Sequence, residues 1–435
     1  MEAVAVIAEF NPFHNGHARL FTRIRERTGE ETAIAAVMSG CFTQRGEPAL
    51  LDKWTRTQAA LACGADLVIE LPFAYAAAGA GRFAAGGVAL ADATGVCRTL
   101  AFGSETGDLG VLDATARLLV REPPEFRDRL RARLDLGEPF AGARIAALEE
   151  YLAAAAPAPE DGCDAAPDAS CLRTSNNILA VEYLAALRRT GSPMVPMAVL
   201  REGADDRDHD IGAAIASATA IRAAVRTCRQ DPAGAFQAVR PQMPAQSVAL
   251  LVSAMLAGEA PVLPEDLAGT AITMLRSLPP AVLASFAGME EGLSARLAAA
   301  AARPASDDPA RSPALLDDLL EAAATRRFAS TRIRRAVAAM LAGLTREDLA
   351  LFDRDGGGPR YLRVLGFTRR GRRLLRIMRG RARLPIMMNA SDFLEYGNDA
   401  ALTRMAALDR VSTDLWMLAR GFPCGRDFDT PPIMV

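Results

Sequence analysis

Short apolar segments alternate with helical segments over the first hundred residues of the chain. Between the apolar segments, apolar side chains recur at helical spacing. Strands that lack a polar face must be covered on both sides, and their alternation with helices is typical of a parallel sheet. The sequence therefore predicts an α/β fold with a doubly wound parallel sheet. The four predicted strands are Ala3–Phe10, Thr32–Met38, Ala65–Leu71 and Thr99–Gly103.

The rest of the chain of 435 residues is expected to divide near residue 230. A helical pattern covers Asp108–Tyr151, and Met194–Leu200 is expected to form a fifth strand. Between them, segment 153–170 is rich in alanine and poor in bulky apolar residues, which predicts a flexible loop. We expect residues 1–230 to form an α/β domain and residues 231–435 a mainly helical domain.

Composition places the chain among ordinary globular proteins. Hydrophobic residues make up 50% of the sequence and charged residues 23%, and no apolar run approaches the roughly 18 residues of a membrane span. The first residues show neither the basic region nor the cleavage site of a secretory signal. The seven cysteines are scattered and form no CxxC pair, so neither a disulfide framework nor a zinc site is indicated. A cytoplasmic protein without a membrane partner is expected.

Two residue types are so rare that their positions are informative. The 50 basic residues comprise 49 arginines and one lysine, Lys53, and two of the three histidines, His14 and His17, lie three positions apart. Arginine cannot replace the compact ammonium of lysine at a point-charge site. We therefore expect the chemistry of this protein to involve its first sixty residues.

The segment Asn11–His17 (NPFHNGH) follows the first predicted strand and opens the first predicted helix. A helix N-terminus presents unpaired N–H groups and a partial positive charge to an anion, and Gly16 allows a ligand to approach the backbone. His14 and His17 can donate hydrogen bonds to an α-phosphate as its charge grows in the transition state. HxGH in this context is typical of HIGH-type nucleotidyltransferases, which predicts that residues 1–230 form a nucleotidyltransferase-like domain that binds ATP. The alternative is structural, with His14 as a helix cap and His17 in the core.

A second phosphate-binding motif is expected after the last strand of the sheet. The segment SATAIR places the hydroxyls of Ser217 and Thr219 near Arg222, where they could hold the β- and γ-phosphates. The alternative is an ordinary helix start with a hydroxyl cap.

The segment Ser39–Arg56 follows the second predicted strand and is expected at the ligand-binding edge of the sheet. Within it, Lys53 would neutralise charge as pyrophosphate leaves; a structural salt bridge is the alternative. The polar and glycine residues of this segment are Gly40, Gln44, Arg45, Gly46, Asp52, Lys53 and Arg56.

Longer motifs in the chain resemble the tRNA(Met) cytidine acetate ligase family over Val4 to about Pro385. In chain order these motifs are AEFNPFHNGH, MSGCFTQRGEPALLDKWTR, GADLVIELPF, LAFGSETGD, SNNILAVEYL, SATAIR and YLRVLGFTRRGRRLL. Members of that family activate acetate with ATP to acetyl-adenylate. They then transfer the acetyl group to N4 of the wobble cytidine, at position 34, of elongator tRNA(Met). The resemblance implies that this chain is a ligase acting on ATP, acetate and elongator tRNA(Met).

The resemblance also implies an ATP site built from several segments. It implies ATP contacts at Gly103 in FGSE, at Asn176 in SNNILA, and at Arg201 with Glu202. The segment that follows, GADDRDHD, departs from the family pattern, with His209 as the counterpart of a family histidine. Further ATP contacts are implied along the first strand and turn, at Ile7, Ala8, Glu9, Phe10, Asn11, Pro12, Phe13, His14, Asn15, Gly16, His17 and Leu20.

A basic segment in the second half of the chain predicts contact with RNA. Arg326–Arg383 contains 17 arginines and 4 acidic residues in 58 positions, a net charge of +13. Such a stripe is the electrostatic footprint of a nucleic-acid site, whereas the alternative is a solvated helix face in an arginine-biased proteome. The densest group, which we call the arginine cluster, consists of Arg369, Arg370, Arg372 and Arg373.

Two other functions stay open at this point. A small-molecule nucleotidyltransferase that adenylylates a phosphorylated metabolite would share the first domain but would not need a second domain with a basic segment. A non-catalytic RNA-binding protein would need no ATP chemistry. Mg²⁺ is an ordinary partner of a triphosphate, although no carboxylate cluster in the sequence requires it. The oligomeric state is left open.

Overall fold

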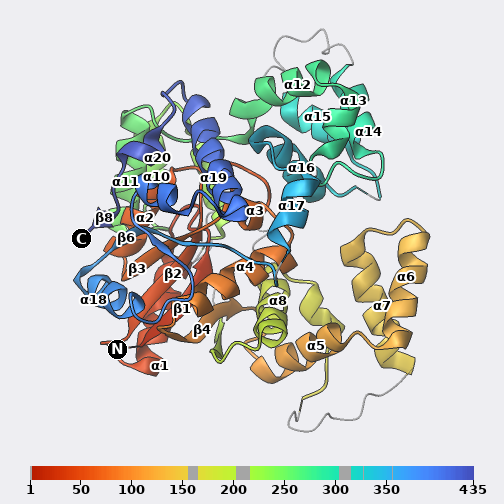
Figure 1. Ribbon diagram of the computed structural model, residues 1–435, viewed down its shortest axis with the longest axis horizontal. Coiled ribbons are helices and arrows are strands. Elements are labelled where there is room, and N and C mark those ends of the chain that lie inside the picture. Colours follow the sequence, from red (N-terminus) through yellow and green to blue (C-terminus); the bar gives the residue numbers. More distant parts are fainter. Residues whose placement is uncertain (1, 155–164, 202–215, 303–314, 327, 355) are drawn as a thin grey trace.

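A mostly parallel sheet forms the centre of the computed structural model, which describes the chain apart from residues 1, 155–164, 202–215, 303–314, 327 and 355 (Figure 1). The strand order is β5-β4-β1-β2-β3-β6-β7, and β8 pairs with β6. The first five strands run parallel, as predicted. The strands are β1 (Ala3–Ala8), β2 (Ala33–Ser39), β3 (Leu67–Leu71), β4 (Cys97–Ser104), β5 (Val195–Leu200), β6 (Leu362–Phe367), β7 (Ile386–Met387) and β8 (Ile433–Met434).

The sheet is covered on both faces because its strands carry apolar side chains on both sides. Along β1, Val4 and Val6 pack into one core with Phe21 and Ile24 of the first helix. The alternate residues, including Ile7, pack into a second core with the helices on the other face. The predicted doubly wound α/β fold is therefore confirmed.

Helices in the first half of the chain surround the sheet, and α6 and α7 form a hairpin that projects from it (Figure 1). The predicted helical stretch 108–151 is thus three helices. The predicted loop 153–170 begins inside α7, and its residues 155–164 lie outside the described part. These helices are α1 (Asn15–Thr28), α2 (Lys53–Ala62), α3 (Phe73–Ala76), α4 (Ala80–Ala93), α5 (Leu109–Arg121), α6 (Pro124–Asp135), α7 (Phe140–Ala154), η1 (Ala169–Leu172), α8 (Ser175–Thr190) and α9 (Ala218–Thr227).

The second half of the chain is mainly helical. Among the described residues, none of the helices is both long and apolar enough to cross a bilayer. The elements are α10 (Pro232–Val239), α11 (Ala245–Leu256), η2 (Pro264–Leu267), α12 (Ala268–Ser277), α13 (Pro280–Ser285), α14 (Leu293–Ala301), α15 (Leu315–Ala323), α16 (Ser330–Ala342), α17 (Arg346–Phe352), α18 (Arg369–Met378), η4 (Ala390–Tyr396), α19 (Ala400–Leu418) and α20 (Arg426–Asp429).

Three strands from this second half join the sheet, which the sequence did not predict. β6 pairs antiparallel with β3, with Leu67 opposite Phe367, and β7 and β8 each pair with β6. One sheet thus contains residues from both sides of position 230, although the division of function at that position stays a prediction.

Candidate active site

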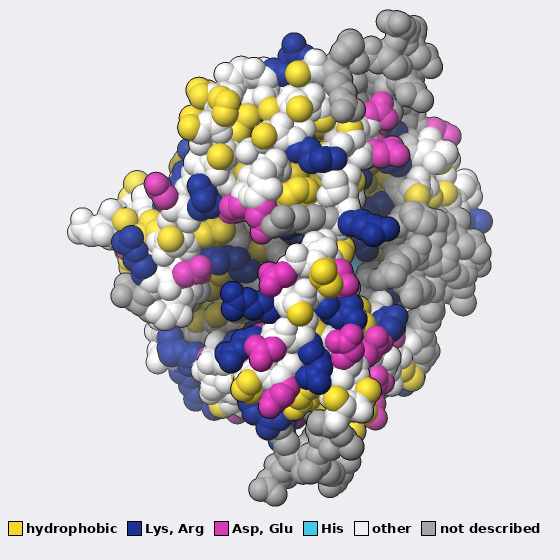
Figure 2. All heavy atoms as spheres, turned by 90° about the vertical axis from the view of Figure 1, so that its right-hand side faces the viewer, with side chains coloured by type: hydrophobic (Ala, Val, Ile, Leu, Met, Phe, Trp, Pro, Cys, Tyr) yellow, Lys and Arg dark blue, Asp and Glu magenta, His cyan; other side chains and the backbone are white. Residues whose placement is uncertain are grey.

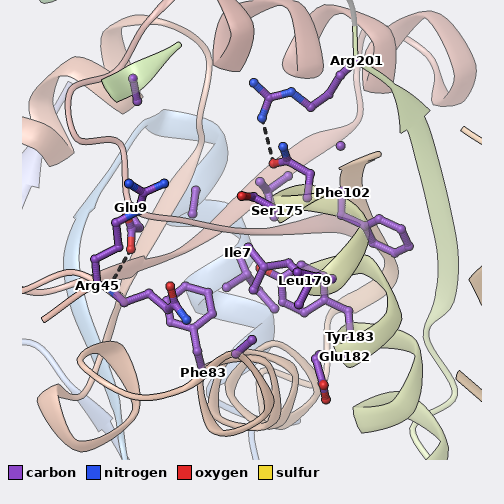
Figure 3. A pocket seen from close by; sticks show the side chains of 18 of the residues that line it. Ile7, Glu9, Arg45, Phe83, Phe102, Ser175, Leu179, Glu182, Tyr183 and Arg201 are labelled. Atoms are coloured by element: carbon purple, nitrogen blue, oxygen red, sulfur yellow. Dashed lines mark hydrogen bonds between the residues drawn. The ribbon is translucent and has the colours of Figure 1, made fainter. Parts of the chain in front are cut away.

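A cavity of about 770 Å³ opens at the carboxyl ends of the parallel strands (Figure 3). Glu9 after β1, Arg45 after β2, Gly103 near the end of β4 and Arg201 after β5 all line it. Ligands bind at this edge in doubly wound sheets, and the volume lies within the roughly 300–1,000 Å³ of ligand pockets. The predicted ATP contacts that line the cavity are Ile7, Ala8, Glu9, Phe10, Asn11, His14, Gly16, His17, Leu20, Gly103, Asn176 and Arg201.

The HxGH turn holds its two imidazoles through reciprocal bonds with the backbone. His14 is the N-cap of α1, and its Nδ1 accepts from the N–H of Gly16 at 3.0 Å. The Nδ1 of His17 accepts from the N–H of His14 at 3.2 Å. Since a neutral imidazole carries one proton, both rings must hold it on Nε2. The expected cap role of His14 is therefore present, and both histidines also line the cavity.

Both histidines are neutral at physiological pH. Burial, helped by Arg201 and Arg222, lowers the pKa of His14 from 6.5 to about 3. Burial, with His14 and Arg201 as further causes, holds the pKa of His17 well below 6.5. The imidazoles can therefore donate hydrogen bonds to a phosphate but bring no charge. Positive charge at this end of the cavity comes from arginine.

The motifs FGSE and SNNILA meet beside Arg201, which follows β5. Asn176 donates through Nδ2 to Oε1 of Glu105 at 2.7 Å. Its Oδ1 accepts from Nη1 of Arg201 at 2.7 Å, and this bond is the dashed line that starts at Arg201 in Figure 3. A Cβ on Gly103 would lie 3.1 Å from Cγ of Arg201, so glycine gives this side chain its room. The structure thus brings Gly103, Asn176 and Arg201 together, while Glu202 lies outside the described residues.

The SATAIR segment lies beside the HxGH turn, but its side chains form hydrogen bonds with other groups of the protein. Ser217 is the N-cap of α9 and accepts from the N–H of Ala220 at 3.0 Å. Arg222 donates to Oγ1 of Thr219 at 3.0 Å and to the carbonyl of Asn11 at 3.1 Å. Ser217 therefore has the cap role that was the alternative, and a phosphate role for the three side chains stays a prediction.

Residues from the second half of the chain form hydrogen bonds with the HxGH turn and hold it in place. Asn15 donates through its N–H to the carbonyl of Gln242 at 3.0 Å and through Nδ2 to that of Pro241 at 2.9 Å. Ser247 Oγ donates to the carbonyl of Phe13 at 2.7 Å. Pro12, Phe13 and Asn15 are not among the residues that line the cavity, and an ATP contact at these three positions stays a prediction.

Lys53 lies in a buried ion cluster and not in the cavity wall. Its side chain is 0% exposed, and Nζ lies 2.8 Å from a carboxylate oxygen of Glu70 and 2.8 Å from one of Asp427. Arg363 of β6 contacts Asp427 at 2.7 Å. The four charges compensate one another, so the ammonium has no free side toward a triphosphate. The structure thus has the salt bridge that was the alternative to a role at the phosphates.

Arg56 is the buried residue that ties the ends of two strands together. Its guanidinium donates to the carbonyls of Glu9 after β1, of Ser39 at the end of β2, and of Gly40. Its Nε donates to the carbonyl of Leu51. Arg56 therefore fixes the backbone from which the HxGH turn departs.

The arginine cluster lies at the far edge of the sheet. It opens α18, and the N–H of Thr368 just before it donates to the carbonyl of Asp66, which precedes β3. This is the amino edge of the parallel strands, whereas the cavity lies at their carboxyl edge. Three of the four arginines are exposed, and Arg370 is paired with Glu31 at 3.2 Å. The structure therefore does not bring the cluster to the cavity.

The sequence analysis did not single out several residues of the cavity wall. Arg144 of α7 and Glu182 of α8 form an ion pair at 2.7 Å there. Arg335 of α16 lines it from the second half of the chain. A lone glutamate or arginine on a helix carries no local signal, since its partner is set by packing; the basic composition of 326–383 was the one available indication for Arg335.

Comparisons with known proteins identify relatives over the whole length. The profile of the family described as HIGH Nucleotidyl Transferase matches residues 1–426. The tRNA(Met) cytidine acetate ligase of Acetivibrio thermocellus is 36% identical over 98% of this chain and 97% of its own. That of Syntrophotalea carbinolica is 41% identical over 90% of this chain and 85% of its own.

Solved structures give the same result. The apo crystal structure of Thermotoga maritima TmcAL superposes with a TM-score of 0.88 at 32% identity. The structure of that protein bound with alpha-thio ATP superposes with a TM-score of 0.87. Both comparisons cover 100% of each chain. The chain belongs to the tRNA(Met) cytidine acetate ligase family of HIGH nucleotidyltransferases.

Proposed function

We propose that this chain is an ATP-dependent acetate ligase that modifies tRNA. It joins acetate to N4 of the wobble cytidine, at position 34, of elongator tRNA(Met), and the product is N4-acetylcytidine. The observation that supports this most strongly is the similarity to tRNA(Met) cytidine acetate ligases over nearly the whole chain. The cavity with its two neutral imidazoles supplies the matching chemistry.

The first step activates acetate. A carboxylate oxygen of acetate attacks the α-phosphorus of ATP, the bond from that phosphorus to the β-bridging oxygen breaks, and pyrophosphate leaves. The Nε2–H groups of His14 and His17 donate to the α-phosphate oxygens, whose charge rises in the transition state. Arg201 supplies positive charge from the end of β5, and Arg222 does so from beside the turn. This catalysis consists of positioning and electrostatic stabilisation.

The second step transfers the acetyl group. N4 of the cytidine attacks the carbonyl carbon of acetyl-adenylate, the bond from that carbon to the phosphate oxygen breaks, and AMP leaves. The amine loses one proton to solvent. Because the mixed anhydride is a reactive acyl donor, this step requires a well-placed acceptor more than an acid–base triad.

We further propose that residues 1–230 perform the ATP chemistry and that the basic segment of residues 231–435 binds the tRNA. A six-residue strand spans roughly 20 Å, so an RNA arm could contact both the cavity and the arginine cluster only by lying along the side of the sheet. Mg²⁺ would arrive bound to ATP by phosphate oxygens and water. In the described part of the chain, no three His, Cys, Asp or Glu side chains are grouped to bind a metal. The site of action is the cytoplasm.

One assay tests the proposed function. Purified protein is incubated with ATP, labelled acetate and either bulk tRNA or no RNA, and pyrophosphate release and label in RNA are measured. Acetate-dependent release with label in tRNA is expected. Release that requires a phosphorylated metabolite would instead indicate a small-molecule nucleotidyltransferase, and absence of ATP turnover would indicate an RNA-binding protein.

The imidazoles are tested separately by His17→Ala. Loss of a transition-state donor costs about 100- to 1,000-fold in rate, so acetate-dependent pyrophosphate exchange should fall by that factor while tRNA affinity is retained. Thr22→Ala, at an exposed position of the same helix, is the matched control. Equal loss of exchange and tRNA binding in His17→Ala would mean that the residue is structural.

A further inference from the structure

A carboxylate and a guanidinium lie side by side in the cavity wall, away from the HxGH turn. Oε1 of Glu182 is 2.7 Å from Nη1 of Arg144, and Glu182 is only 7% exposed. Figure 3 shows Glu182 and Arg201 at opposite ends of the cavity. Arg201 therefore does not compete for this pair, and the first step as proposed above assigns the pair no role.

The second oxygen of Glu182 accepts no hydrogen bond from another described residue. Among the described residues, Arg144 is the one hydrogen-bonding partner of this carboxylate. Oε2 lies 3.3 Å from the place where a Cβ on Gly81 would stand. Because residue 81 is a glycine, no side chain of that residue covers the oxygen. Both Gly81 and Glu182 line the cavity.

Aromatic side chains surround this end of the cavity. Phe102 and Tyr183 lie with their ring centroids 5.8 Å apart, and Phe83 faces the same space (Figure 3). Phe140, at the start of α7, is 57% exposed, and its ring lies 5.8 Å from the guanidinium of Arg144. Phe83, Phe102 and Tyr183 are only 2%, 4% and 3% exposed and form the floor of this end, so the exposed ring of Phe140 is the one that can stack on a nucleobase, at about 1–3 kcal/mol per base.

We propose that this end of the cavity binds the acceptor cytosine, turned out of the anticodon loop, and that Glu182 and Arg144 recognise its Watson–Crick edge. That edge presents the N4 amine as a donor and N3 and O2 as acceptors. A carboxylate beside a guanidinium presents one acceptor followed by donors, which is the complementary order. The inference rests on the proposed function, which makes cytidine the acceptor.

The charge of Glu182 argues against the other two substrates at this place. ATP and acetate are both anions: Arg144 neutralises the charge of the pair as a whole, but an anionic group at hydrogen-bond distance from Oε2 of Glu182 would still be repelled by that oxygen. An uncharged amine, in contrast, gains a hydrogen bond to a charged acceptor. The pair therefore selects the one uncharged reacting group of the reaction.

The surroundings also provide an entrance for RNA. Phe140 and Arg144 belong to the α6–α7 hairpin, whereas Thr331 and Arg335 belong to α16 in the basic segment, and all four line the cavity. Figure 2 looks onto this side and shows Lys and Arg side chains, with Asp and Glu side chains among them, around its central hollow. Within the described ranges, Arg335 forms no ion pair, and its charge can therefore meet a phosphate of the entering strand.

The variant Glu182→Gln tests the inference because it keeps the shape and removes the charged acceptor. Acetyl transfer to tRNA(Met) should fall by about 10- to 100-fold in kcat/KM, the range expected for one base-reading pair. Acetate-dependent pyrophosphate exchange should fall far less. Glu149→Gln on α7 is the matched control, because Glu149 is exposed, pairs with Arg173 and does not line the cavity.

Base preference is the measurement that a merely structural role would not change. Two forms of tRNA(Met) that cannot react are compared as inhibitors of acetyl transfer: one already acetylated at N4 and one with uridine at the wobble position. The direct binding of unmodified tRNA(Met) is measured for comparison. Wild type should bind the cytidine form more tightly than the uridine form, because O4 of uracil is an acceptor facing Glu182. Glu182→Gln should lose that preference, since its amide can donate to O4.

Several outcomes would overturn the inference. If Glu182→Gln keeps the cytidine-over-uridine ratio of wild type, the pair does not read the base. If that variant does not fold, Gly81→Ala takes its place: its methyl group would cover Oε2 and should reduce acetyl transfer more than pyrophosphate exchange, and an equal reduction would contradict the proposal. A wild-type protein that fails to acetylate tRNA would refute the proposed function itself, which is distinguishable from an active enzyme that is indifferent to Glu182.

Discussion

The neutral state of His14 can be tested directly, because the chain has only three histidines. Burial lowers its pKa from 6.5 to about 3, which corresponds to roughly 5 kcal/mol at 1.36 kcal/mol per pKa unit. At pH 6 an ordinary imidazole is about three-quarters protonated, whereas His14 would be protonated in about 0.1% of molecules. A titration can therefore separate the buried, neutral ring from an ordinary solvated one.

The assay is heteronuclear NMR of the protein with ¹³C-labelled histidine between pH 5.5 and 8.5. Variants His14→Asn and His17→Asn assign the signals, and His209 is then assigned by elimination. The signals of His14 and His17 should stay constant over this range. A His14 signal that titrates with a midpoint between pH 6 and 7 would refute the reasoning, because the ring would then be charged or solvated at the pH of the reaction.

The same pKa shift predicts how stability depends on pH. Since the folded pKa of His14 lies below the unfolded value, the unfolded state binds more protons between about pH 6.5 and pH 3. The free energy of unfolding is therefore unaffected by this group above pH 6.5 and decreases as the pH falls below it. Urea unfolding at pH 7.5 and 5.5 should show a larger loss in wild type than in His14→Asn.

Three further predictions concern other parts of the structure. Lys53→Met leaves the buried carboxylates of Glu70 and Asp427 without their ammonium, and the free energy of unfolding in urea should fall by about 3–5 kcal/mol; a loss below 1 kcal/mol would contradict the buried cluster. Gly103→Ala places a methyl group 3.1 Å from Cγ of Arg201 and should raise the KM for ATP about tenfold, whereas an unchanged KM would mean that Arg201 does not contact ATP. Replacing the arginine cluster by glutamine should weaken tRNA binding and lower the salt slope by about 0.9 for each phosphate that the variant no longer neutralises, and equal affinity at several salt concentrations would exclude a role in RNA binding.

The sequence predicted the features that depend on neighbouring residues. The apolar strands, the helix that starts after them and the position of the HxGH turn are all set within a few residues, and each is present in the structure. The place of β6 depends on a partner about 300 residues away in β3. No local sequence pattern predicts such a pairing, because an apolar run of strand length can also be part of a buried helix.

Lys53 illustrates the same limit of prediction from local sequence for a single side chain. Its rarity predicts a position where an ammonium is needed, but rarity does not tell which anion it meets. The anions are Glu70 on the neighbouring strand and Asp427, which lies close to the other end of the chain. The burial that makes this cluster stable also separates it from the cavity.

The late strand β6 has a consequence for how the protein is made. During synthesis, β3 emerges from the ribosome with an open edge, and its partner follows only after almost 300 further residues. Lys53 and Glu70 are likewise translated long before Asp427 arrives to complete their charge balance. An enzyme built this way cannot complete its central sheet while translation is still under way, so a prematurely terminated chain would expose an unpaired strand and a half-neutralised core.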